Sequence, residues 1–209
     1  MDHKKIRKEI SQYYFTVLFV ILNIIIFLIC TITGELLYNI GAFFVWDVVT
    51  KKEYYRLLSA VFLHYDIDHL FNNMILLFFI GRIVEKYIGH VGYFVVYIFS
   101  GIGGNIISAL WELKIERYSY SVGASGAVFG LTGALLVIVL FHKGRLEQIK
   151  WQGVVVMLLL SVYNGFVVDN INNAAHIGGL IIGILIAVIV SARRKREGNA
   201  KTIHFSDTL

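Results

Sequence analysis

Residues 122–141 read VGASGAVFGLTGALLVIVLF, a run without a charged residue that contains four glycines. A helix needs about 20 mainly apolar residues to cross a bilayer, so this run is long enough. Gly126 and Gly130 are four apart, and small residues at this spacing let a second membrane helix approach closely. Ser125 lies near the start of the run. The stretch therefore predicts a spanning helix that carries a serine near one end and packs tightly against a partner.

Five further apolar segments accompany this one, so the sequence predicts an all-α membrane protein with a bundle of six spanning helices. The chain of 209 residues is 57% hydrophobic and 16% charged, whereas soluble domains average roughly 45–50% and 25%. This composition excludes a disordered chain, a collagen-like repeat and an ordinary soluble enzyme. The expected spans cover about 10–34, 69–88, 91–111, 122–141, 151–168 and 172–192. The second is the weakest, because its uncharged part, 69–81, is short.

The positions of Lys and Arg predict the topology. With the N-terminus inside, 14 of the 19 Lys and Arg residues fall in inside segments and 5 in outside segments. Cytoplasmic segments carry the excess of positive charge, so we expect a multi-pass protein of the plasma membrane with both ends in the cytoplasm. The net charge of +5 is then a signal of topology and not of nucleic-acid binding. Residues 1–192 are expected to form one domain, followed by a basic, flexible cytoplasmic tail at 193–209.

The outer loop between the first two spans, about 34–68, is too apolar for a plain solvated loop. Segments 36–40, 42–46 and 54–63 are rich in aliphatic and aromatic residues. Such segments are typical of the membrane interface or of a partly embedded hairpin. We therefore expect a membrane-embedded loop; the alternative is a small extracellular subdomain.

Polar residues inside the spans gather at one depth. His69 and Asn73 open the second span, Ser125 lies near the start of the fourth, and His176 lies near the start of the sixth. Because these three spans all run from outside to inside, the four residues are expected just below the outer surface. Polar groups at membrane depth are costly and are candidates for function.

These residue types can support nucleophilic catalysis. A serine hydroxyl becomes a nucleophile when a base takes its proton, and His176 is a base at matching depth. His69 and Asn73 are four apart and share a helix face. Both can donate hydrogen bonds to an oxyanion, as can the backbone N–H of Ser125; such donors are worth about 3–4 kcal/mol each in known hydrolases.

Other interpretations of the same residues remain open. Asn72 competes with Asn73, since it lies three residues from His69. Polar residues in a bundle can also line the path of a transporter or channel. A metal site is the least favoured, because no H-E-x-x-H helix is present; its candidate ligands are His64, Asp66, Asp68 and His69.

Three motifs in order resemble the rhomboid intramembrane serine proteases of the bacterial, six-helix type. They are His64-x4-His69-x3-Asn73, then Gly123-Ala-Ser125-Gly126, then Ala175-His176-x2-Gly179-x3-Gly183. The resemblance implies a six-helix bundle with a Ser–His dyad in a water-filled cavity open to the outside. By position, Ser125 would be the nucleophile, His176 the general base, His69 and Asn73 the oxyanion-stabilising pair, and His64 a more structural histidine.

The resemblance also implies an activity. It is a serine endopeptidase that cleaves transmembrane segments of single-pass substrates in the lipid bilayer through an acyl-enzyme, without cofactor, metal or nucleic acid. A pseudoprotease that binds membrane clients is the alternative within the family. Two positions depart from the family pattern: Tyr55-Arg56 stands where Trp-Arg is frequent, and Phe129 where many members have Tyr.

Overall fold

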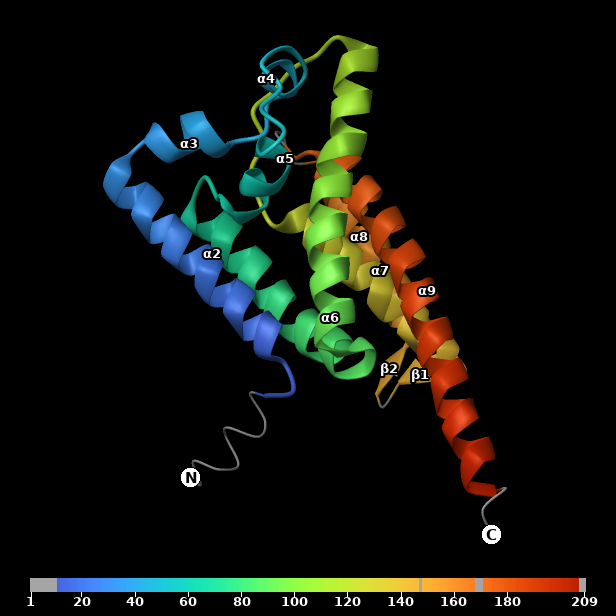
Figure 1. Ribbon diagram of the computed structural model, residues 1–209. Coiled ribbons are helices and arrows are strands. Elements are labelled where there is room, and N and C mark those ends of the chain that lie inside the picture. The colour runs from blue at the N-terminus through green and yellow to red at the C-terminus, as the bar shows by residue number, and fades with distance from the viewer. Residues whose placement is uncertain (1–10, 147, 168–170, 207–209) are drawn as a thin grey trace.

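The computed structural model describes residues 11–146, 148–167 and 171–206, and the described chain is nearly all helical (Figure 1). Five long helices form the body of the molecule, and short elements connect them. The long helices are α2 (Tyr14–Thr33), α6 (Ile67–Ile115), α7 (Ser125–Phe141), α8 (Trp151–Val167) and α9 (Asn173–Ser206). Between α2 and α6 lie α3 (Leu36–Gly41), α4 (Val45–Thr50), α5 (Arg56–Ser59) and the 3-10 turn η1 (Ala60–Phe62); β1 (Arg145–Leu146) and β2 (Ile149–Lys150) form a hairpin between α7 and α8.

Several helices are suited to a membrane by length and composition. Tyr14–Thr33, Ile67–Ile115 and Asn173–Arg194 are long and apolar enough to cross one, and Ser125–Phe141 and Trp151–Tyr163 are shorter apolar helices. The predicted class, a helical membrane protein, therefore fits the structure. α9 continues as a helix to Ser206, through most of the segment 193–209 that the sequence predicts as a flexible tail.

Helix α6 consists of two arms that meet at Gly89. This residue has φ 78° and ψ 167°, a conformation outside the helical region. Glycine adopts a positive φ without the steric cost that a Cβ imposes, so the chain can turn here without a proline. Figure 1 shows the first arm leading down to this elbow and the second arm leading back up from it. The arms hold the predicted spans 69–88 and 91–111.

Helices α7 and α9 pack with almost no space between their backbones. A Cβ on Gly179 would lie 2.1 Å from the carbonyl oxygen of Gly126, and one on Gly183 would lie 2.1 Å from that of Gly130. Such distances exclude any side chain larger than hydrogen. The expectation that the glycine faces of these two segments allow close approach is therefore confirmed.

The loop 34–66 is folded around a buried arginine. Arg56 is 4% exposed, and its guanidinium donates to the carbonyl oxygens of Ala42 (2.8 Å) and Asn39 (2.9 Å). The same group pairs with the carboxylates of Asp47 and Glu53. A buried cation held by two carboxylates and two carbonyls fixes the path of α3, α4 and α5, so this loop forms a rigid unit.

A buried carboxylate ties the start of α2 to the first arm of α6. Glu85 accepts hydrogen bonds from the backbone N–H groups of Phe15 (2.9 Å) and Thr16 (2.8 Å) and from Thr16 Oγ1 (2.7 Å). Its other neighbour is His90 Nδ1, at 2.6 Å. The free N–H groups of a helix start need acceptors, and Glu85 supplies them. The start of α2, the Gly89 elbow and the hairpin thus lie at one end of the molecule (Figure 1).

Candidate active site

Ser125 is the first residue of α7, and the segment before it is fixed by the loop 34–66. Phe43 and Ser121 form an antiparallel bridge with two N–H···O bonds of 2.9 Å, and the N–H of Gly123 donates to the carbonyl of Ala60 (2.9 Å). Gly123 has φ 134°, which is why residues 122–124 are not helical although the sequence predicts a span from 122. The serine therefore stands at a sharp turn into the helix.

His64 contacts the backbone of this turn. Its side chain is fully buried, and its Nε2 accepts the N–H of Ala124 at 3.4 Å. Burial lowers the pKa of His64 to about 3, so the ring is neutral and keeps a lone pair for that N–H. This histidine contacts the backbone next to Ser125, as a structural residue would.

His176 lies in the first turn of α9, and that turn is fixed by Asn172. The Asn172 Oδ1 accepts the N–H of Ala175 (3.0 Å), which is the usual N-cap contact. Its Nδ2 donates to Ser108 Oγ (2.7 Å) on α6 and to Ser121 Oγ (3.2 Å). One side chain thus joins α6, the segment before Ser125 and the start of α9. Asn172 was not predicted from the sequence as a site residue, although an asparagine before an apolar helical run is a typical N-cap signal.

The structure brings Ser125 and His176 into direct contact. His176 Nε2 lies 2.8 Å from Ser125 Oγ. The Phe129 ring stacks on the imidazole, with centroids 4.4 Å apart and planes at 13°, and His176 is 8% exposed. Within the described part of the chain, His176 Nδ1 has no hydrogen-bond partner. Among the described residues, Ser125 and His176 therefore form a pair without a third member. The pair is buried where α7 contacts α9.

His69 lies beside this pair. Its Nε2 would be 2.7 Å, and Ser125 Oγ 3.7 Å, from a Cβ placed on Gly123. Only glycine leaves room for the imidazole at this point. The His69 ring also meets the His64 ring edge to face, at 5.0 Å between centroids. The His69 ring and the Ser125 hydroxyl therefore both lie beside Gly123.

Asn73 and Asn72 differ in burial. Asn73 is 5% exposed, and its Nδ2 donates to the carbonyl of His69 at 3.0 Å, whereas Asn72 is exposed. Of the two candidates from the sequence, Asn73 is the one on the inner face of α6. Its amide would have to leave the His69 carbonyl, or share its hydrogens, to reach a ligand.

The alternative metal ligands do not converge. Among the residues that the structure describes, no three His, Cys, Asp or Glu side chains come close enough together to hold a metal ion. His64 and His69 are neighbours. The Asp66 carboxylate instead acts as the N-cap of α6, where it accepts a hydrogen bond from the His69 backbone N–H (2.7 Å).

A hydrogen-bonded serine and histidine, placed where two apolar helices meet, define a helical membrane protein with a candidate serine-hydrolase site. Residues 51–193 match the family model described as the Rhomboid domain. The chain belongs to the rhomboid family.

Curated relatives carry the same family name. The chain is 35% identical over 178 residues to rhomboid protease GluP of Bacillus subtilis (strain 168), an alignment that covers 83% of this chain and 34% of GluP. It is 34% identical over 167 residues to the putative rhomboid protease YdcA of the same organism, covering 80% of this chain and 77% of YdcA. It is 37% identical over 158 residues to RHOMBOID-like protein 4 of Arabidopsis thaliana, covering 75% and 39%. The chain thus spans little more than a third of GluP and of the Arabidopsis protein.

Proposed function

We propose that this protein is an intramembrane serine endopeptidase that cleaves transmembrane segments of membrane-protein substrates. The observation that carries the proposal is the 2.8 Å contact between Ser125 Oγ and His176 Nε2. Serine becomes nucleophilic when a base lies within hydrogen-bonding reach. The relatives named as rhomboid proteases support the same activity.

In the proposed reaction, the Ser125 hydroxyl donates its proton to His176 Nε2 as the oxygen attacks the scissile carbonyl. The imidazolium then protonates the leaving amine, and the substrate's amine-side fragment departs. Water, deprotonated by the same nitrogen, hydrolyses the ester on Ser125 and restores both residues. The stacked Phe129 ring holds the imidazole plane in place through these steps. No cofactor or metal is required.

The oxyanion would be held by groups on α6 and α7. His69 lies beside Ser125 and can donate from its ring, and the Ser125 backbone N–H belongs to the start of α7, where helical N–H groups lack partners. Asn73 supplies a third donor after a rotation of its amide. The positive end of the α7 dipole favours negative charge at the same place.

The arrangement in the membrane is part of the proposal. The two arms of α6 together with α2, α7, α8 and α9 would cross the bilayer six times, with both chain ends in the cytoplasm and the site opening to the outer side of the plasma membrane. The loop 34–66 would lie partly in the outer leaflet, where its exposed aromatic residues fit the interface; these are Trp46, Tyr54, Tyr55 and Tyr65. The substrates would be single-pass proteins whose helix unwinds locally at the site.

The test is cleavage of a single-pass model substrate by the full chain reconstituted in vesicles. The Ser125→Ala and His176→Ala proteins should leave the substrate intact. Ser191→Ala, a serine-to-alanine change on α9 far along the helix from the dyad, should cleave as the wild type does. Undiminished cleavage by Ser125→Ala would overturn the mechanism. If the wild type captures the substrate without cleaving it, the proposed enzymatic activity is wrong and a pseudoprotease is favoured.

A further inference from the structure

Glu112 is a buried acidic residue near the end of α6 that has no part in the proposed reaction steps. It belongs to the second arm of α6, whose end lies beside α4 at the top of Figure 1. The residue is 6% exposed. Acidic side chains are almost never fully buried unless their oxygens are paired, so the groups around this carboxyl group show what holds it there.

Glu112 holds the reversal of the chain that follows α6. Its backbone carbonyl accepts the N–H of Glu116, the left-handed residue with φ 53° that ends the helix, and the N–H of Arg117 (3.2 Å). Its side-chain Oε1 accepts the hydroxyl of Ser119 at 3.3 Å. A left-handed conformation is unfavourable for a residue with a Cβ, so these contacts stabilise a turn that is costly by itself.

The segment that begins at this turn leads to Ser125. Residues 117–120 form neither helix nor strand, so side-chain contacts decide where the segment lies. The Ser119 hydroxyl is held by the Glu112 carboxyl group. Two residues later, the Ser121 hydroxyl accepts the Nδ2 of Asn172 at 3.2 Å. The approach to the serine is therefore fastened to α6 on one side and to the start of α9 on the other.

Asn172 closes these contacts into a ring. Its Nδ2 also donates to Ser108 Oγ at 2.7 Å, and Ser108 lies four residues before Glu112, on the same face of α6. The Glu112 carboxyl group interacts with the Ser108 hydroxyl in turn. The hydrogen-bond ring thus leaves α6 at Glu112, passes through Ser119 and Ser121 to Asn172, and returns to α6 at Ser108.

The ring includes one residue close in sequence to each member of the dyad. Ser119 precedes Ser125 by six residues, and Asn172 precedes His176 by four. Asn172 also accepts the N–H of Ala175, so it fixes the turn of α9 that carries the histidine. Because α6 is bonded to both segments, its end sets the position of the serine relative to the histidine.

We propose that Glu112 is a positioning residue for the reaction of Ser125 with His176, an inference that rests on the proposed function. It acts through the ring and without touching the substrate. Among the described residues, Glu112 Oε2 has no hydrogen-bond partner. An amide keeps Oε1 as the acceptor for Ser119 and loses no bond at the other position. Glutamine should therefore substitute for Glu112, whereas alanine should not.

The experiment measures kcat and KM of the full chain in vesicles with a single-pass model substrate, and fluorophosphonate labelling to completion counts the active molecules. Glu112→Ala and Ser119→Ala should each lower kcat roughly tenfold at unchanged KM, because a displacement of about 1 Å can cost roughly 10²-fold and each variant loosens one contact of the ring. Glu112→Gln should have the wild-type kcat. The double variant Glu112→Ala with Ser119→Ala should be no slower than Glu112→Ala, since both changes remove one interaction.

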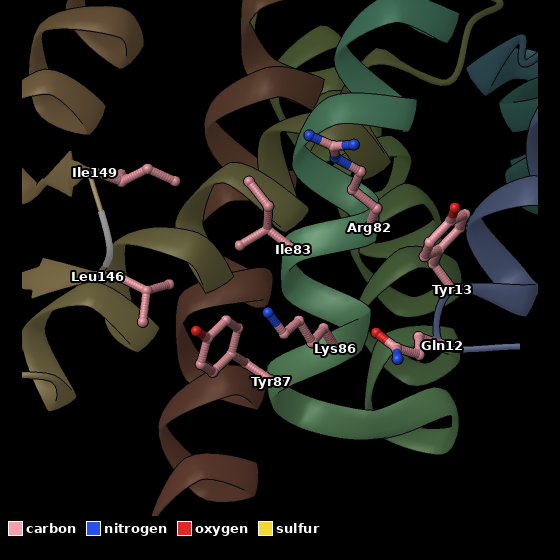
Figure 2. A pocket seen from close by; sticks show the side chains of 8 residues that line it. All are labelled: Gln12, Tyr13, Arg82, Ile83, Lys86, Tyr87, Leu146 and Ile149. Carbon is pink, nitrogen blue, oxygen red and sulfur yellow. The ribbon is translucent and has the colours of Figure 1, made fainter. Parts of the chain in front are cut away.

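Two variants control for the loss of a polar side chain, and both should have the wild-type kcat. Glu35→Ala removes an exposed acidic side chain from the loop 34–66. Gln12→Ala changes a residue of the cavity shown in Figure 2, between the residues before α2, the first arm of α6 and the hairpin. This cavity lies at the other end of the molecule from Glu112 (Figure 1).

A second measurement does not depend on proteolysis. The ¹⁵N NMR signal of the His176 imidazole reports its hydrogen bond to Ser125, and it is assigned by its absence in His176→Gln. In Glu112→Ala and in Ser119→Ala this signal should move toward its position in Ser125→Ala, and in Glu112→Gln it should stay in place. If the wild type cleaves no substrate, the proposed function is wrong, and the imidazole signal still tests the ring.

Three results would overturn the role of Glu112. Wild-type kcat and an unmoved imidazole signal in both alanine variants would mean that the ring does not position the dyad. A raised KM at unchanged kcat would make Glu112 a substrate contact. An equal loss in Glu112→Gln and Glu112→Ala would mean that the negative charge matters and the hydrogen bond to Ser119 does not.

Discussion

Replacing Gly179 with alanine should move α7 and α9 apart and break the serine–histidine contact. The new Cβ would lie 2.1 Å from the Gly126 carbonyl oxygen, 2.8 Å from its carbon and 3.1 Å from its Cα. All three atoms are backbone, so no rotamer change relieves the clash. Packed carbon atoms lie about 3.5–4.0 Å apart, so the helices must separate by roughly 1–1.5 Å at this level.

The size of the effect follows from that separation. Ser125 and Gly126 are neighbours on α7, and His176 precedes Gly179 by one turn of α9, so the 2.8 Å contact opens by a similar amount. A misplacement of about 1 Å in a catalytic group can reduce the rate by 10²-fold. Overpacking of a tight interface costs about 1–3 kcal/mol of stability, against a gain of at most about 1 kcal/mol from replacing glycine in a helix.

The assay is the turnover number for a transmembrane substrate, together with the midpoint of thermal unfolding. Gly153→Ala on α8 is the matched control, because a Cβ there would meet no atom within 4 Å. Gly183→Ala creates an equal 2.1 Å clash, with Gly130, one turn further from the dyad, so it should lower stability more than turnover. Unchanged turnover and stability in the Gly179→Ala protein would show that α7 and α9 can accommodate the added methyl group without moving apart.

Three further predictions concern residues around the pair. Asn172→Ala removes the N-cap and two side-chain hydrogen bonds, so we expect the free energy of unfolding to fall by about 2–3 kcal/mol and kcat to fall as well. Asn172→Asp keeps the acceptor oxygen and should restore only the N-cap contribution. Phe129→Ala should lower kcat by up to roughly tenfold, because a stacked ring pair is worth about 0.5–1.5 kcal/mol, while Phe129→Tyr should match the wild type; equal kcat for all three proteins would contradict this. The folded pKa of His64 lies near 3, below its unfolded value of about 6.5, so stability should fall as the pH drops from 6.5 toward 3; His64→Gln should flatten that part of a thermal-melt profile.

The sequence predicted the apolar body of the protein well, because length and hydrophobicity are read directly from the chain. It placed the ends of the helices less well. The span expected from 122 begins as a helix only at Ser125, since Gly123 has a positive φ. The His69 ring lies against Gly123, where a Cβ would clash with it. The two arms of α6 were expected as separate spans, and the turn between them depends on one glycine, Gly89.

The pairing of Ser125 with His176 could be anticipated from topology, because spans that run in the same direction place their first turns at one depth. The parts that position them could not. Asn172 acts through Ser108 and Ser121, residues 64 and 51 positions away, and no local pattern shows that three segments meet there. Likewise, Arg56 was noted only by its resemblance to a family motif, since its partners are carbonyl groups that any sequence supplies.

The most direct measurement of the central claim is covalent labelling of the full chain in its membrane by a fluorophosphonate, with the modified residue located by mass spectrometry. We predict a single adduct on Ser125 that disappears in His176→Ala and persists in Ser191→Ala. Labelling of Ser125 at the wild-type rate in the His176→Ala protein would contradict it, because the serine would then be reactive without its base.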